Sequence, residues 1–222
     1  MLVCRNLRKI YRTGGGSVEA LSGVDFDVAA GRFVAIIGRS GSGKSSLMAI
    51  IGGLSRPDAG IVCVDGIDIW SLGDAALASL RNRVIGYVFQ FANLLPTLSV
   101  LDNVALPGLL RRPRDSLQVR ERAGWLLRSV GLAQHFDAYP AEISAGEQRR
   151  AGIARALINS PRLLLADEPT SDLDEQSERE VMAELQRAHR EDGITLILVT
   201  HALALTAEAD RVVQIADGVI VP

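Results

Sequence analysis

The chain has 222 residues, of which 48% are hydrophobic and 23% are charged. These values are typical of a globular protein that buries a core, so they exclude a disordered chain and a collagen-like chain. The formal net charge of −2 argues against the basic field on which most non-specific binding of nucleic acids depends.

The cysteines and histidines predict neither a disulfide framework nor a zinc site. Cys4 and Cys63 are far apart, and His135, His189 and His201 are scattered, so the paired spacing of such sites is missing. The chain does not begin with a basic segment and an apolar run, and charges interrupt each apolar stretch before it reaches about 18 residues. We therefore expect a protein of the reducing cytosol that does not itself enter a membrane.

The first predicted elements are strands. Residues 2–10 and 18–28 flank a glycine loop at 14–16, and apolar side chains alternate along the second segment, which is typical of antiparallel strands at the edge of a fold. Residues 33–37 form a continuous apolar run that ends at a glycine, as expected for a strand buried on both faces of a parallel sheet. A helix is predicted to begin near Lys44.

The middle of the chain is predicted to be mostly helical. Residues 74–83 have a helical pattern and residues 84–89 read as a strand, after which helical periodicity dominates from 100 to about 159. Four prolines are expected to mark helix boundaries in this region: Pro96, Pro107, Pro113 and Pro140.

The last third of the chain returns to strands. Residues 163–166 and 195–199 are apolar runs of the buried-strand type. Residues 212–216 and 219–221 flank an Asp-Gly pair, which is a strong signal for a two-residue hairpin. The sum is an α/β core with an antiparallel edge and a helical insertion, in one domain without a separating linker.

Residues 38–45 match the pattern G-x-x-x-x-G-K-[ST], directly between a predicted buried strand and a predicted helix. In such a loop the backbone N–H groups and the helix N-terminus bind phosphate, Lys44 neutralises phosphate oxygens and the Ser45 hydroxyl ligates Mg²⁺. A plain glycine turn would not account for the strand and helix around it. The residues expected to bind the nucleotide here are Gly38, Arg39, Ser40, Gly41, Ser42, Gly43, Lys44, Ser45 and Ser46.

Two carboxylates follow the buried run at 163–166 and supply the acidic partner that a phosphate-binding loop needs. Asp167 is expected to hold Mg²⁺ through water or Ser45. Glu168 is expected to orient or deprotonate the attacking water, which is the task that phosphoryl transfer leaves for a base. The alternative, two solvated loop charges, loses weight beside the phosphate-binding loop.

Residues 143–148 read Ile-Ser-Ala-Gly-Glu-Gln and resemble the ABC ATPase signature, which begins Leu-Ser-Gly-Gly-Gln. The motifs also follow one another in the order of that family, and the resemblance covers essentially the whole chain. It implies an α/β fold with a RecA-like P-loop NTPase core, an antiparallel β subdomain and a helical lobe that carries the signature. Within a single domain of residues 1–222, the core would comprise 1–90 and 155–222, and the lobe 91–154.

The resemblance assigns roles to four more residues. Tyr11 matches the aromatic residue that stacks on adenine, and Gln90 matches the glutamine that senses Mg²⁺ and contacts the lobe, so Gln90 joins the implied metal and catalytic sets. Asp174 matches the D-loop aspartate, and His201 matches the switch histidine that contacts the γ-phosphate. The plainer alternatives are a packing role for Tyr11, a polar strand end for Gln90 and a capping role for His201.

The resemblance also implies a homodimer in the ATP-bound state, with each signature placed over the ATP of the opposite protomer. The residues implied in this contact are Ser144, Ala145, Gly146 and Glu147. Ala145 replaces the first glycine of the signature, and it would be strained only if its φ were positive. Glu147 replaces the usual glutamine, and Ala202 follows His201 where aspartate is common; neither change removes a catalytic atom.

Residues 90–104, together with Glu147, resemble the bacterial branch of lipoprotein-release and macrolide-export ATPases. In that comparison Phe91, Leu94 and Leu95 would be apolar contacts for the cytoplasmic helix of a permease, unless they belong to the core of the lobe. The basic cluster at 111–114 could face anionic lipid, although a solvated loop is the favoured interpretation.

We therefore expect an ATPase that uses ATP and Mg²⁺ and drives integral membrane permease subunits, for export or mechanotransmission. It would be cytoplasmic and peripheral on the inner face of the cytoplasmic membrane. One alternative is the ATPase of a regulatory cell-envelope complex that moves no solute. A soluble ABC protein that acts on nucleic acid or ribosomes is less favoured, because the chain is acidic and shows no zinc module or coiled coil, so no direct binding of nucleic acid is expected.

Overall fold

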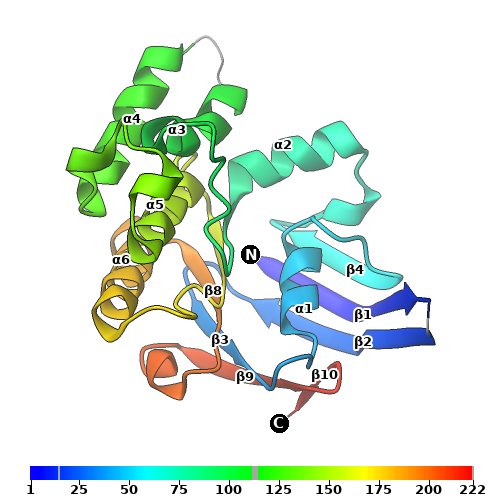
Figure 1. Ribbon diagram of the computed structural model, residues 1–222. Helices are drawn as coiled ribbons and strands as arrows, with labels where there is room; N and C mark the ends of the chain where they lie inside the picture. Colours follow the sequence, from blue (N-terminus) through cyan, green and yellow to red (C-terminus); the bar gives the residue numbers. More distant parts are fainter. Residues whose placement is uncertain (15, 112–114, 222) are drawn as a thin grey trace.

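The computed structural model describes residues 1–14, 16–111 and 115–221, and its centre is a six-stranded sheet (Figure 1). The strand order is β10-β9-β3-β8-β7-β6. All pairs are parallel except β9 with β10. The strands are β3 (Phe33–Ile37), β6 (Ile85–Val88), β7 (Leu163–Asp167), β8 (Thr195–Val199), β9 (Arg211–Ala216) and β10 (Val219–Val221).

A second, antiparallel sheet has the order β2-β1-β4-β5. Its strands are β1 (Leu2–Thr13), β2 (Gly16–Val28), β4 (Ala59–Val64) and β5 (Ile67–Asp68). The strands β4 and β5 were not predicted. They are joined by an Asp-Gly pair like the one at 217–218: Asp65 and Gly66 have φ values of 52° and 78°, close to the 47° and 76° of Asp217 and Gly218. The predicted hairpin at Asp217 and Gly218 is confirmed.

The helices lie on both sides of the six-stranded sheet (Figure 1). In that view α3, α4, α5 and α6 lie together on one side, and α1 lies beside β1 and β2 on the other. The helices are α1 (Lys44–Ile51), α2 (Asp74–Val84), α3 (Val100–Arg111), α4 (Ser116–Ser129), α5 (Ala145–Leu157) and α6 (Glu175–Asp192), and short 3-10 turns occupy Ile69–Ser71, Ala133–His135, Pro140–Glu142 and Leu203–Thr206.

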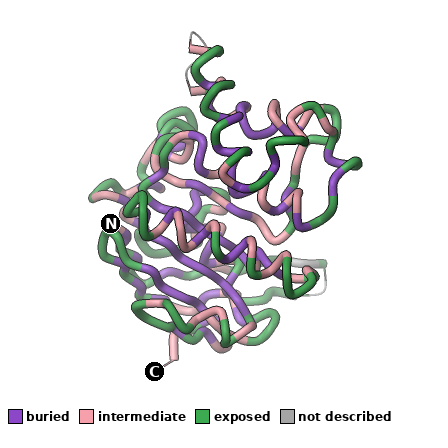
Figure 2. The backbone as a smooth tube through the Cα atoms, turned by 90° about the vertical axis from the view of Figure 1, so that its left-hand side faces the viewer, coloured by how far each residue is buried: buried purple, intermediate pink, exposed green. Residues whose placement is uncertain are grey.

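Two hydrophobic cores follow from the alternation of side chains along the parallel strands. On β7, Leu163 and Leu165 contribute to the core beneath α1 and the antiparallel sheet, whereas Leu164 and Ala166 contribute to the core beneath α3 to α6. Figure 2 shows the buried positions concentrated in the central strands. Burial on both faces explains why these strands read as continuous apolar runs.

The expectation that every proline marks a helix boundary is wrong at Pro107, which lies inside α3. The helix continues because Val100, Val104 and Ala105 are buried in the core, and this packing outweighs the backbone donor that proline lacks. Pro113 lies outside the described residues. Among the described residues, none of the helices has both the length and the apolar character that crossing a bilayer requires.

Candidate nucleotide-binding site

The glycine-rich loop joins β3 to α1, and close backbone contacts require glycine at both ends of its motif. A Cβ at Gly38 would lie 2.3 Å from the Ile215 carbonyl oxygen, and one at Gly43 would lie 2.3 Å from that of Ala20. Gly43 also has a φ of 107° and forms the N-cap of α1. The loop thus presents backbone rather than side chains at the helix N-terminus, which is the arrangement that binds phosphate.

Lys44 is the buried cation of this loop. Its side chain is mostly covered, with the whole residue only 5% exposed, and its ammonium group donates to the carbonyl oxygens of Gly38 at 2.9 Å and Arg39 at 3.0 Å. The same Nζ lies 3.7 Å from Oε1 of Glu168. The positive charge is therefore held inside the curve of the loop and next to the expected catalytic carboxylate.

Ser45 and Asp167 lie together, as the residue pattern predicts for two ligands of one Mg²⁺ ion. The Ser45 hydroxyl donates to Oδ1 of Asp167 at 3.3 Å. Burial raises the pKa of the Asp167 carboxyl, while the hydrogen bond from Ser45 and the charge of Lys44 act in the opposite direction. A hydroxyl and a carboxylate are the hard oxygen ligands that Mg²⁺ prefers, so these two side chains fit that ion.

Tyr87, on β6, is a neighbour of this pair that the sequence reasoning missed. Its hydroxyl is hydrogen-bonded to Asp167, and burial together with that carboxylate raises the pKa of Tyr87. The phenol therefore stays protonated and donates the bond. Tyr87 lies in the strand predicted at 84–89, but its place opposite Leu165 on β7 depends on the order of the strands, which the sequence did not show.

Glu168, in the loop after β7, contacts both the loop after β8 and the glycine-rich loop. Its backbone has a φ of 46°, and its N–H donates to the Val199 carbonyl oxygen at 2.9 Å. The Ser171 hydroxyl donates to Oε2 of Glu168 at 3.2 Å, and Nδ1 of His201 lies 3.8 Å from the same oxygen. The structure thus brings together Lys44, Glu168 and His201 from three separate segments.

Tyr11 and Gln90 lie outside this group. Tyr11 is on β1 with 40% of its surface exposed, and Lys9 Nζ lies 5.3 Å from the centre of its ring. Gln90 is half-buried in the loop after β6. Within the described part of the chain, neither side chain is hydrogen-bonded to Lys44, Glu168 or His201.

The signature-like segment forms the start of α5, with Ser144 as the N-cap. Glu147 completes a capping box: its carboxylate accepts bonds from the Ser144 N–H and hydroxyl, both at 2.8 Å, and its own N–H donates to Ser144 Oγ at 3.3 Å. The bond from the Ser144 N–H lowers the pKa of Glu147, and His135 Nε2 lies 3.0 Å from the same carboxylate. The Ser-x-x-Glu spacing was the signal for this box.

The two small residues of the segment are explained by their surroundings. Ala145 opens α5 and does not have a positive φ, so the alanine is unstrained there. A Cβ at Gly146 would lie 2.6 Å from Ser177 Oγ, so close packing on α6 favours glycine. Asp174 caps α6 by accepting from the Ser177 N–H at 2.9 Å and the Ser177 hydroxyl at 2.8 Å, and this lowers its pKa.

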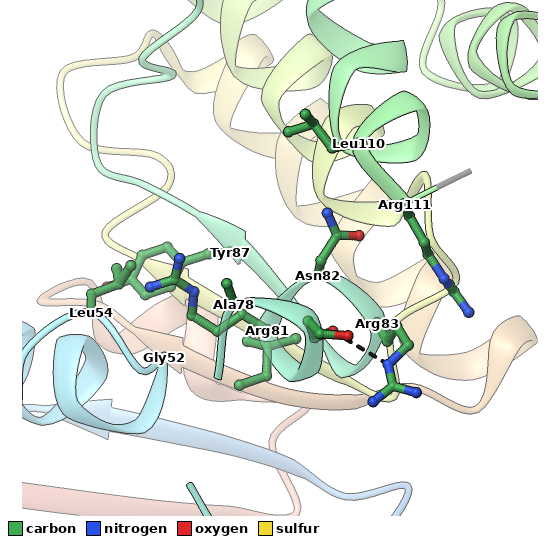
Figure 3. A pocket seen from close by; sticks show the side chains of 11 residues that line it. Gly52, Leu54, Ala78, Arg81, Asn82, Arg83, Tyr87, Leu110 and Arg111 are labelled. Carbon is green, nitrogen blue, oxygen red and sulfur yellow. Dashed lines mark hydrogen bonds between the residues drawn. The ribbon is translucent and has the colours of Figure 1, made fainter. Parts of the chain in front are cut away.

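A pocket of about 740 Å³ lies away from the phosphate loop, between the end of α1, α2, β6 and the end of α3. Figure 3 shows Arg81 and Tyr87 on one side of the space and Leu110 and Arg111 on the other. Arg81 donates to the Gly53 carbonyl oxygen at 2.9 Å, and a smaller pocket beside it also contains Tyr87 and reaches Asn93.

The predicted apolar contacts divide into two groups. Phe91 is 62% exposed and Leu95 is 44% exposed, whereas Leu94 packs against the core under the helices. The core alternative therefore applies to Leu94 alone. Of the basic cluster at 111–114, residues 112–114 lie outside the described residues.

Known proteins resemble this chain over its whole length. The ABC transporter family matches residues 21–171. The lipoprotein-releasing system ATP-binding protein LolD of Syntrophotalea carbinolica is 47% identical over 218 residues, which cover 98% of this chain and 96% of that protein. The macrolide export ATP-binding/permease protein MacB of Syntrophobacter fumaroxidans is 47% identical over 223 residues, covering 100% of this chain but 31% of that protein.

Two dimeric structures of ABC cassettes have the same fold. One is a bacterial ABC transporter cassette and the other is a post-hydrolysis state of an ATP-binding cassette with ADP and phosphate. Each superposes with a TM-score of 0.94 at 36% identity and covers 100% of this chain and 97% of the other.

Proposed function

This chain belongs to the ABC transporter family and is an ABC-type ATPase, and from that premise we propose that two copies of it close around Mg·ATP and drive a separate membrane permease. The observation that carries the proposal is the convergence of Lys44, Glu168 and His201 beside Ser45 and Asp167. This arrangement places a phosphate-binding cation, a base and two side chains that can bind one Mg²⁺ ion at one point of the fold.

Each side chain has a distinct task in this proposal. The amides of residues 38–46 and Lys44 bind the phosphates, and the exposed ring of Tyr11 stacks on adenine. Ser45 and Asp167, with Gln90, hold Mg²⁺, which when bound neutralises charge on the phosphate oxygens. Glu168 is the base and orients and deprotonates the attacking water, and His201 contacts the γ-phosphate.

We place the signature in the opposite protomer's site. Figure 1 shows α5 with α3, α4 and α6, whereas α1, which follows the phosphate loop, lies on the other side of the sheet. The start of α5 combines a helix N-terminus with the small residues Ala145 and Gly146, so a phosphate of the partner's ATP could approach its amides closely. Glu147 stabilises the N-terminus of α5, and Asp174 stabilises the N-terminus of α6.

The division of the single domain, 1–222, supports the same arrangement. The helices α3 and α4 and most of α5 lie within residues 91–154, the proposed helical lobe, and the strands of the six-stranded sheet lie within 1–90 and 155–222. The two parts share a core across the sheet.

The partner we propose is a permease in the cytoplasmic membrane, with this chain peripheral on the inner face. The MacB relative is described as an ATP-binding/permease protein, and this chain matches 31% of it. The exposed Phe91 and Leu95 are the contacts that we propose for a cytoplasmic helix of the permease, and the pocket in Figure 3 is a separate hollow that such a helix could also enter. The two named relatives are described as a macrolide export protein and as part of a lipoprotein-releasing system, so they favour export as the output, and mechanotransmission is the other output that we propose.

The test is to purify the tagged Glu168→Gln variant from native membranes with Mg·ATP and to identify the proteins that accompany it. An integral membrane permease that is retained with Mg·ATP and reduced with Lys44→Ala would support the proposal. Retention of soluble factors alone would contradict it.

A further inference from the structure

Arg149 is a buried arginine on α5 that none of the proposed chemical roles uses. Only 5% of it is exposed, although it lies just two positions beyond the capping box at the start of the helix. Burial lowers the pKa of Arg149, with Asp172 acting in the opposite direction. Burial of a guanidinium group is costly unless its donors are satisfied, so the partners of Arg149 indicate its role.

The two arms of the guanidinium reach two separate loops. Nη1 donates to the Phe89 carbonyl oxygen at 3.2 Å, and Nη2 donates to the Ser171 carbonyl oxygen at 3.2 Å. The planar fork of arginine can span two acceptors in this way, whereas the single ammonium of lysine cannot hold both in the same geometry. Arg149 therefore joins the segment after β6 to the segment after β7.

One end of this bridge leads to the base. Ser171, whose carbonyl oxygen binds Arg149, donates its hydroxyl to Oε2 of Glu168 at 3.2 Å. Its backbone N–H also donates to the Glu168 carbonyl oxygen, at 3.3 Å. A displacement of Ser171 would thus change the direction in which the Glu168 carboxylate points.

The other end of the bridge leads to the surface. The guanidinium carbon of Arg149 lies 5.6 Å from the centre of the Phe91 ring, which is cation–π distance. Phe91 is 62% exposed, so its ring, which is within cation–π distance of Arg149, is also accessible to a partner.

We propose that Arg149 is a positioning residue that links the orientation of Glu168, through Ser171, to the segment that contains Phe89 and the exposed Phe91. The inference rests on the proposed function, because it concerns how the base is held. A partner that moves Phe91 would alter the bridge and thereby the rate of hydrolysis, without contact with the nucleotide.

A double-mutant cycle on kcat tests the first half of the bridge. Ser171→Ala keeps the carbonyl oxygen that binds Arg149 and removes only the hydroxyl that binds Glu168. We expect Arg149→Gln and Ser171→Ala each to lower kcat about tenfold at unchanged KM for ATP, as for a lost hydrogen bond to a charged group. The double variant should be no slower than the slower single variant, because both changes break one connection.

The matched control is Arg150→Gln, since Arg150 is the next residue on α5 and pairs with Glu180 on α6 instead of with the loops. Its effect on kcat should multiply with that of Ser171→Ala, and the free energy of unfolding is measured for every variant. If Arg149→Gln does not fold, Arg149→Lys, which keeps the charge but not the fork, completes the cycle.

The second half is tested with Phe91→Ala, which should lower kcat about threefold and have no further effect in the Arg149→Gln background. An unchanged kcat in Phe91→Ala would overturn the link to the surface. Multiplicative losses for Arg149→Gln and Ser171→Ala, or single variants with unchanged kcat, would overturn the link to the base. Absence of ATP hydrolysis by the unmodified chain would instead contradict the proposed function itself.

Discussion

Glu168 has three partners that restrict its carboxylate: Lys44 at 3.7 Å, His201 at 3.8 Å and the Ser171 hydroxyl at 3.2 Å. Two of these partners come from the phosphate loop and the loop after β8, so the carboxylate that we propose as the base lies beside both segments. A carboxylate that is fixed by its neighbours loses little freedom when it orients a water molecule, which is what efficient general-base catalysis requires.

Lys44→Ala should weaken binding of ATP by about tenfold or more, because a buried ammonium no longer neutralises phosphate. Titration of the chain with a fluorescent ATP analogue measures this. Arg190→Ala removes an exposed charge that pairs with Glu208 and should leave the affinity unchanged. Equal affinity in Lys44→Ala and the unmodified chain would refute the role of Lys44.

Asp167→Asn should raise the free energy of unfolding at neutral pH and abolish Mg²⁺-dependent hydrolysis. Burial raises the pKa of Asp167 in the folded chain, so its ionised form opposes folding above the folded pKa, and that cost is absent below the unfolded pKa. The advantage of the variant should therefore shrink as the pH falls through this range. Urea unfolding at several pH values measures it; a variant less stable than the unmodified chain at neutral pH would contradict the assignment.

At the residue scale the sequence predicted that Ser45 and Asp167 would lie together, but it missed Tyr87, which is hydrogen-bonded to Asp167. The motif pattern identified Lys44, Asp167 and Glu168. Arg149, by contrast, binds two backbone carbonyl groups, and such contacts leave no residue pattern that could be read in advance.

The backbone conformation at the start of α5 determines whether Ala145 is strained in the signature-like segment. Ala145 is the first residue of the helix and has no positive φ, so glycine would relieve no strain. Ala145→Gly should therefore give no gain in ATP-driven dimerisation, measured by light scattering, and should cost at most about 1 kcal/mol of stability. A marked gain in dimerisation would show that the methyl group obstructs the contact.

The loop that presents Leu95 is held by Asn103 on α3, which is only 1% exposed. Its Oδ1 accepts from the Leu95 N–H at 2.7 Å, and its Nδ2 lies within 3.1 Å of the carbonyl oxygens of Leu95, Leu98 and Ser99. The buried side-chain amide of Asn103 therefore stabilises the conformation of this loop.

Asn103→Ala should lower the free energy of unfolding by about 2 kcal/mol or more, because it leaves buried backbone groups unpaired. Denaturant unfolding measures the loss. The control is Thr97→Ala, an exposed position in the same loop, which should change stability by less than about 0.5 kcal/mol. Similar values for the two variants would contradict the role of Asn103.

Among the elements, the apolar runs and the periodic segments at 18–28 and 74–83 were predictable, whereas the helix α6 was missed. The strands β3, β7 and β8 are buried on both faces and stand out in the sequence, whereas α6 places only Val181, Met182, Leu185 and Ala188 in the core along a mostly charged helix. The error at Pro107 has the same origin, since tertiary packing decided a boundary that local preference did not.

The whole molecule combines an open six-stranded α/β core with a helical layer that carries the signature-like segment and with an exposed Phe91. The order of the motifs along the chain predicted an ABC-type ATPase with an α/β fold, and the family match and the two cassette structures confirm that family and that fold. The identity of the partner was beyond prediction, because its recognition depends on a surface whose counterpart belongs to another chain.

The most direct test of the account is the oligomeric state of the Glu168→Gln variant, measured by light scattering with and without Mg·ATP, together with its rate of hydrolysis. The account predicts a dimer that forms with Mg·ATP, persists because hydrolysis falls by about a hundredfold or more, and does not form in Lys44→Ala. A variant that stays monomeric with saturating Mg·ATP, or that hydrolyses ATP near the rate of the unmodified chain, would contradict it.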